Sequence, residues 1–232
     1  MSTKMKEQEL VGLIVVTFSS LILAVLSTWY IWNNQTDAHP LPDILLDNIY
    51  DLSHVQFGIV NILVTLQYII GIYSFKREDR FKYIAQTVLL QSIISVLRAI
   101  TATSTLLPNL HVYDYCKLRP DNFFQVLGYM IQYGTCADYM FSGHTATSTL
   151  SWLMSDTPYK TINFILLTQV ALFLLLQRWH YTVDIIVGFV VAWGLHYVYV
   201  NNTSKEWYYF NSFVLKECKE KRKERKFRIN TI

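Results

Sequence analysis

Long apolar runs separated by short polar connectors dominate this chain. Residues 11–32 and 52–75 contain no charged side chain, and residues 83–107 contain only Arg98. A helix of about 20 apolar residues suffices to cross a bilayer. We therefore predict an all-α, polytopic membrane protein with six transmembrane helices, at residues 11–32, 52–75, 83–107, 141–154, 161–177 and 181–203.

Two further segments are predicted to lie outside these spans. Residues 123–133 are apolar but too short to cross, which favours an interfacial or re-entrant helix. Residues 33–51 are predicted to be a loop, because Pro40 and Pro42 forbid a regular helix there.

Composition agrees with a membrane protein. The chain of 232 residues is 52% hydrophobic and 16% charged, whereas soluble domains carry roughly 25% charged residues. The predicted organisation is a cytosolic N-terminal tail (1–10), a membrane catalytic domain (11–204) and a basic cytosolic tail (205–232). The first apolar run exceeds the roughly 7–15 apolar residues of a signal peptide, so we expect a retained anchor.

Lysine and arginine set the orientation. They gather at the N-terminus, at 76–82, at 155–160 and in the tail, while residues 33–51 contain none. The positive-inside rule then places both termini in the cytosol. The starts of the fourth and sixth spans, and the candidate chemistry described next, would face the lumen or the exterior.

Two histidines begin these two spans. His180 lies four residues before Asp184, so the carboxylate could accept the Nδ1 proton and fix the ring tautomer. Such a pair also arises often by chance. His144 follows Ser142 and Gly143, where the simplest interpretation is a helix whose N-terminus is capped by Ser142.

Two arginines could neutralise phosphate oxygens near these histidines. Arg98 lies within an otherwise uncharged span and needs a partner there. Arg178 precedes His180 closely, although an anchor at the membrane interface would explain it equally well. The set fits phosphoryl transfer without a metal. Cys116, Cys136 and Cys218 form neither a metal cluster nor a disulfide framework.

The motifs as a whole resemble the sphingomyelin synthase family, within the lipid phosphate phosphatase superfamily. The resemblance rests on Cys136-Ala137-Asp138-x-x-x-Ser142-Gly143-His144-Thr145 and on His180-Tyr181-Thr182-x-Asp184. Two weaker motifs, Pro40-Leu41-Pro42-Asp43 and Arg98-Ala99-Ile100-Thr101, occur in the matching order. Ala137 stands where the family usually has Gly, and His39 where it usually has Pro, which leaves the headgroup preference open.

The resemblance implies a mechanism that needs no cofactor and no nucleic acid. His180, oriented by Asp184, would attack the phosphorus of a phospholipid donor, and His144 would protonate the departing diacylglycerol. Ceramide would then accept phosphocholine from the phosphohistidine. Arg98, Arg178, Ser142, Gly143, Asp138 and Tyr181 would contact the substrate. The implied location is the Golgi or the plasma membrane, and whether the chain forms a homo-oligomer stays open.

Other functions remain compatible with these residues. Phosphoethanolamine or phosphoinositol could replace phosphocholine. Water could replace ceramide, which would make the protein a lipid phosphate phosphatase, and a transporter or receptor would need no chemistry at all. We also predict that Cys116 and Cys136 pair in the non-cytosolic loop, where oxidation is permitted.

Overall fold

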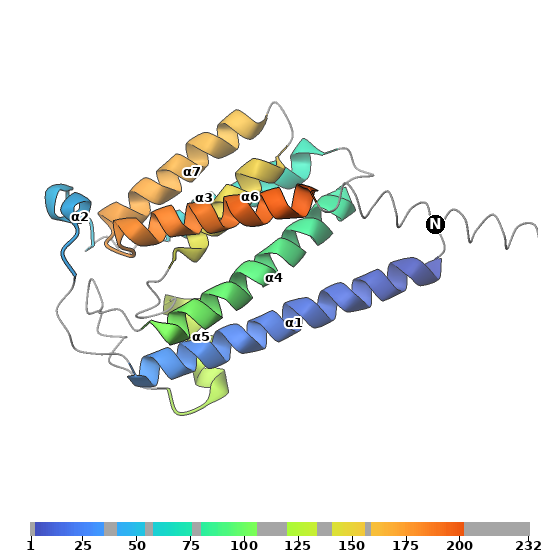
Figure 1. Cartoon of the computed structure of the whole chain (residues 1–232), viewed down its shortest axis with the longest axis horizontal. Helices are drawn as coiled ribbons and strands as arrows, with labels where there is room; N and C mark the ends of the chain where they lie inside the picture. Colours follow the sequence, from blue (N-terminus) through green and yellow to red (C-terminus); the bar gives the residue numbers. More distant parts are fainter. Residues whose placement is uncertain are drawn as a thin grey trace, which may run out of the picture. The chain divides into compact units, whose positions relative to one another are not determined.

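The computed structural model of the chain describes residues 3–34, 41–53, 58–75, 80–105, 120–133, 141–155 and 159–201. Over these residues every regular element is a helix and no strand occurs, which confirms the all-α prediction (Figure 1). In chain order the helices are α1 (Thr3–Asn34), α2 (Ile44–Asn48), α3 (Ile59–Ser74), α4 (Arg80–Ser104), α5 (Phe123–Tyr133), α6 (Gly143–Met154), α7 (Tyr159–Leu176) and an unlabelled last helix (Thr182–Asn201).

The chain divides into two compact units, Met1–Trp193 and Gly194–Ile232. Only residues 194–201 of the second unit are described, and they form the end of the last helix. The two histidine motifs and their partners all lie within the first unit.

Within the described ranges four helices are long and apolar enough to cross a membrane, so this is an integral membrane protein. These segments are Val11–Asn34, Tyr83–Ser104, Tyr159–Leu176 and Thr182–Asn201. Helix α3 is apolar but has only 16 residues, and α6, which is rich in Ser and Thr, has 12. The count of six spans therefore stays a prediction. Helix α1 also continues back to Thr3, through residues predicted to be a polar tail, because Lys, Glu and Gln are good helix formers.

Helix α2 departs from the prediction of a continuous loop at 33–51. The two prolines precede it, and the helix begins directly after Asp43, whose carboxylate accepts hydrogen bonds from the amides of Leu45 and Leu46. An aspartate N-cap of this kind satisfies amides that a first turn otherwise leaves unpaired. By contrast, α5 has the bounds predicted for the short apolar helix, and its place in the membrane stays a prediction.

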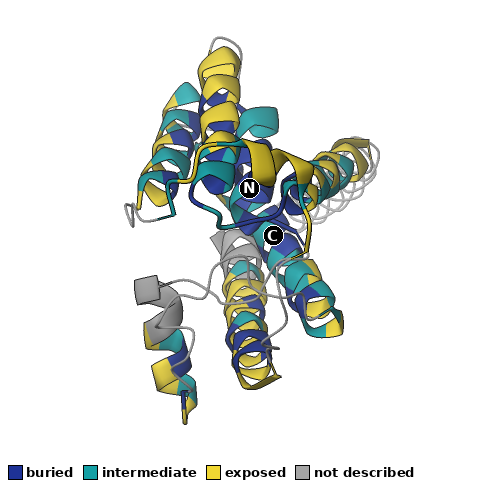
Figure 2. Ribbon diagram, turned by 90° about the vertical axis from the view of Figure 1, so that its left-hand side faces the viewer, coloured by how far each residue is buried: buried dark blue, intermediate teal, exposed yellow. Residues whose placement is uncertain are grey.

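Helix α6 is the centre of the packing in the first unit. It contacts α3, α4 and α7, while α1 packs along α4. Residues Thr145 to Ser151 of α6 are all buried, and all but Leu150 have small side chains, which let neighbouring helices approach closely. Figure 2 shows exposed residues along the outward faces of the helices and buried ones where the helices meet.

Hydrogen bonds between helices connect several polar side chains of this interior. The Thr147 hydroxyl donates to Gln91 Oε1 on α4 (2.8 Å). Ser148 donates to Gln67 on α3, and the Gln67 amide donates to the Asn163 carbonyl on α7 (2.8 Å). Buried polar groups of this kind hold membrane helices in register, because lipid offers them no alternative partner.

Candidate active site

The two histidine motifs meet where α6 and the last helix begin. The Ser142 amide donates to the Asp184 carbonyl (2.9 Å). One turn further, Gly188 lies against the same residue, and a Cβ there would lie 2.7 Å from the Ser142 carbonyl oxygen. Only glycine permits this approach, so Gly188 fixes the distance between the two motifs.

His180 and Asp184 are in direct contact and almost fully buried. His180 Nδ1 lies 3.3 Å from Asp184 Oδ2, and the exposed fractions of the two residues are 5% and 0%. The same oxygen accepts the Tyr181 amide (3.0 Å). The sequence placed both residues on one helical face, whereas His180 lies in the bend before the helix. The contact forms because Asp184 folds back over the turn that precedes the helix.

His144 has a different partner, which sequence reasoning missed. Its Nε2 lies 2.9 Å from Asn61 Oδ1 on α3, while Nδ1 is buried without a hydrogen-bond partner among the described residues. The Trp179 ring lies beside the imidazole, 5.9 Å between centroids. Arg98 and His180 are both within electrostatic range. The sequence could have indicated Asn61 as a candidate site residue, because it is a polar residue inside an uncharged apolar run.

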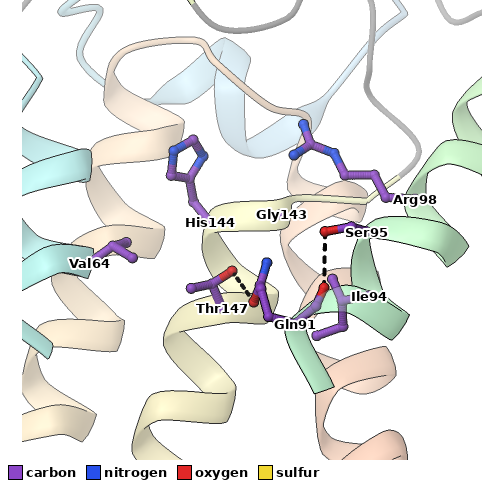
Figure 3. A pocket seen from close by; sticks show the side chains of 8 residues that line it. All are labelled: Val64, Gln91, Ile94, Ser95, Arg98, Gly143, His144 and Thr147. Carbon is purple, nitrogen blue, oxygen red and sulfur yellow. Dashed lines mark hydrogen bonds between the residues drawn. The ribbon is translucent and has the colours of Figure 1, made fainter. Parts of the chain in front are cut away.

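Arg98 reaches the start of α6 from α4. Figure 3 shows its guanidinium extending over Gly143, with His144 on the other side of the helix start. A Cβ at Gly143 would overlap the Arg98 guanidinium, so the guanidinium could not keep this position beside any other residue. The pocket between them has a volume of about 160 Å³ and is lined by Val64, Gln91, Ile94, Ser95, Arg98, Gly143, His144 and Thr147. It therefore joins one cation and one imidazole in a small, partly polar space.

Ser142 is the N-cap of α6, and its contact with substrate stays a prediction. Its hydroxyl accepts the Thr145 amide (3.2 Å), which is the N-cap that the structural interpretation predicted. Its burial is complete. Through its backbone it also joins the two motifs, so its local role positions Gly143 and His144.

Arg178 lies in the turn between α7 and the last helix and is not among the residues that line the pocket. Its φ of 56° is left-handed, and the amides of Arg178 and Trp179 donate to the carbonyls of Leu175 and Leu174 (both 3.0 Å). This is the Schellman ending of a helix. The guanidinium lies 3.4 Å from the Ile49 carbonyl and 3.7 Å from Asp51. Arg178 thus joins the turn before His180 to the segment after α2.

Tyr181 and Asp43 connect the first loop to the second histidine motif. The Tyr181 hydroxyl accepts the Leu41 amide (3.0 Å), and its ring is 3% exposed. Asp43 accepts both the amide and the hydroxyl of Thr182 (2.7 and 2.8 Å). Burial alone would raise the pKa of the Asp43 carboxyl, but the hydrogen bonds from Thr182, Leu46 and Leu45 outweigh it and lower the pKa below its ordinary value.

Three predicted residues lie outside the described ranges. They are Asp138, a predicted substrate contact, and the cysteines of the predicted pair, Cys116 and Cys136.

One family model and one known protein are similar to parts of this chain. The family model described as PAP2 superfamily C-terminal matches residues 135–201, a segment that contains both histidine motifs. The chain is also 29% identical over 175 residues to sphingomyelin synthase-related 1 of Caenorhabditis elegans, a match that covers 66% of this chain. The matched segment is 36% of that relative, so the chain spans about a third of its length.

The fold, the site and these matches agree on a class of protein. They support an integral membrane protein related to the lipid phosphotransferases and phosphatases. More narrowly, the relationship is to the sphingomyelin synthase and lipid phosphate phosphatase superfamily. This is the relationship that the four sequence motifs predicted.

Proposed function

We propose that this protein is a phospholipid:ceramide headgroup transferase. It moves phosphocholine from phosphatidylcholine to ceramide and yields sphingomyelin and diacylglycerol. The observation that carries the proposal is the junction of the two histidine motifs. The imidazole of His180 is held by Asp184, whose carbonyl accepts the Ser142 amide at the start of α6. His144 of that helix shares a pocket with Arg98.

In the first half-reaction His180 Nε2 attacks the phosphorus of the donor. The phosphorus–oxygen bond to the glycerol breaks, its electron pair goes to that oxygen, and His144 supplies the proton that completes diacylglycerol. Asp184 stabilises the charge on the His180 ring. Arg98 donates to the phosphoryl oxygens, where fixed positive charge lowers the energy of the transition state.

The second half-reaction reverses these roles. His144 takes the proton of the primary hydroxyl of ceramide, whose oxygen attacks the phosphohistidine. The phosphorus–nitrogen bond breaks, its electron pair returns to His180, and sphingomyelin leaves. By the distribution of basic residues, these steps occur on the lumenal or exterior face of a Golgi or plasma membrane.

The leading alternatives share the first half-reaction. A phosphatidylethanolamine or phosphatidylinositol donor would give other phosphoceramides, and water as acceptor would make the protein a lipid phosphate phosphatase. The match to the PAP2 superfamily supports this last alternative equally well. The sphingomyelin synthase-related match favours ceramide.

One experiment distinguishes these reactions. Full-length protein in nanodiscs receives labelled ceramide together with phosphatidylcholine, phosphatidylethanolamine or phosphatidylinositol, and the products are identified by mass spectrometry. We expect labelled sphingomyelin and stoichiometric diacylglycerol with the choline lipid. Release of free phosphocholine without labelled sphingomyelin would contradict transfer to ceramide, and His180→Ala serves as the inactive control.

A further inference from the structure

The carboxylate of Asp43 connects two segments that are far apart in the chain. Oδ1 accepts the amides of Leu45 and Leu46 and the Thr182 hydroxyl, and Oδ2 accepts the Thr182 amide. One side chain therefore satisfies the first turn of α2 and the first residue of the last helix. A carboxylate suits both positions, because amides at the start of a helix carry partial positive charge.

A second contact runs parallel to the first. The Tyr181 hydroxyl accepts the amide of Leu41, two residues before Asp43. The Tyr181 ring also packs in a buried cluster with Ile31 of α1, Leu46 of α2 and Ala102 of α4. The two residues that follow His180 are thus both held by the first loop.

These contacts bear directly on the geometry of His180. Thr182 lies midway between His180 and Asp184, and the Tyr181 amide donates to the same carboxylate oxygen that faces the imidazole. A shift of the chain at Thr182 would change the orientation of the imidazole relative to Asp184. A displacement of about 1 Å in a catalytic group can cost on the order of 10²-fold in rate.

We propose that Asp43 is a positioning residue for His180, acting through Thr182. The inference rests on the proposed function, in which His180 is the nucleophile. Asp43 touches neither substrate nor the reacting atoms in this arrangement. Its effect is to keep the bend 180–182 in the conformation in which the imidazole meets Asp184.

The test compares two aspartates of the same short segment. Asp43→Ala removes the four hydrogen bonds, and Asp47→Ala is the matched control, because Asp47 is an exposed carboxylate on α2. Phosphohistidine formation from phosphatidylcholine is measured per folded enzyme in nanodiscs. We expect Asp43→Ala to lower kcat by about 10–100-fold with KM for the donor changed less than about threefold, and Asp47→Ala to match the wild type.

A second measurement does not depend on activity. Hydrogen exchange of the Thr182 amide should become at least about tenfold faster in Asp43→Ala, since its acceptor is lost, and should not change in Asp47→Ala. Thr182→Val removes only the hydroxyl donor and should lower kcat less than Asp43→Ala does. Thr182→Ser keeps the hydroxyl and should have a kcat close to that of the wild type. The two Thr182 variants test the same contact if Asp43→Ala does not fold.

The outcomes separate the two proposals. Wild-type kcat in Asp43→Ala, unchanged exchange at Thr182, or a loss explained wholly by fewer folded molecules would each overturn the positioning role. Absence of phosphohistidine in the wild-type protein with every phospholipid would instead overturn the proposed function, and exchange at Thr182 would still report whether Asp43 holds the bend.

Discussion

His180 and His144 are neighbours in one site, yet their surroundings differ in charge and in origin. His180 faces a buried carboxylate four residues away in the chain, whereas His144 faces the carboxamide of Asn61, which comes from another helix. Either partner can fix the tautomer of an imidazole, but only a carboxylate adds the negative charge that stabilises an imidazolium. The difference supports the proposal that His180 is the nucleophile and His144 the proton donor, and these roles stay predictions.

The largest expected effect comes from removing the proposed nucleophile. His180→Ala should abolish both half-reactions, because no phosphohistidine can form. Acid-quenched protein incubated with headgroup-labelled phosphatidylcholine provides the measurement. Label retained on His180→Ala at the wild-type stoichiometry would show that another residue carries the phosphoryl group.

A reactive leaving group tests the role of His144. A phenolate leaves without protonation, so His144→Ala should regain much of its first half-reaction with an aryl phosphodiester substrate. Because general acid catalysis contributes about 10²–10⁴-fold, the rescue should have that size. His180→Ala should regain nothing. Rescue of His180→Ala but not of His144→Ala would reverse the two assignments.

Gly188 tests whether the two histidines must be held together. In Gly188→Ala the new Cβ would meet the Ser142 carbonyl oxygen at 2.7 Å, and such overpacking costs about 1–3 kcal/mol. We expect a lower thermal midpoint and slower turnover. Gly12→Ala is the matched control, because its Cβ would meet nothing within 4 Å. Equal behaviour of the two variants would mean that the motifs tolerate separation.

Asn61→Ala tests the contribution of the hydrogen bond between Asn61 and His144. Asn61→Ala removes the hydrogen bond to His144 and should slow the first half-reaction by about 5–30-fold, the equivalent of about 1–2 kcal/mol. The loss should shrink with the aryl substrate, since His144 is then dispensable. A loss of the same size with both substrates would indicate a role in folding or binding.

The smallest effect concerns the acid sensitivity of the Asp43 contact. The pKa of the Asp43 carboxyl is lower in the folded protein than the ordinary 3.8. The stabilisation that the carboxylate contributes to the fold is therefore complete above the unfolded pKa and is lost as the pH falls through the folded pKa. Exchange at the Thr182 amide, corrected for its intrinsic rate, should be constant from pH 7 to pH 5 and faster only in strong acid. Loosening near pH 6 would implicate a histidine instead.

Local sequence predicted the elements on which the site is built. Long apolar runs with at most one or two charged residues predicted α1, α4, α7 and the last helix, because burying apolar side chains in lipid outweighs other local preferences. Ser142 was expected as an N-cap, and it is one. The contact between His180 and Asp184 was predicted from their spacing of four residues. The bend at His180, through which the contact forms, was not predicted.

The sequence did not indicate which segments would be in contact, even where, as at Asn61, a polar residue in an apolar run was noticeable. Asn61 meets His144 from 83 residues away in the chain, and Asp43 meets Thr182 from 139 residues away. Nothing in the local pattern of either residue specifies its partner. Residues 33–51 were likewise predicted to be a loop, because the two prolines argued against a helix, and the short helix that begins after Asp43 was not expected.

The sequence by itself determined that this is a membrane protein with two histidines, a carboxylate and an arginine in motifs typical of phosphoryl transfer between lipids. Only the tertiary structure decided which groups meet. It directs Arg98 toward the pocket and Arg178 toward Asp51. The physical reason is that hydropathy depends on each side chain separately, whereas hydrogen bonds and close packing depend on the positions of two atoms that the fold alone brings together.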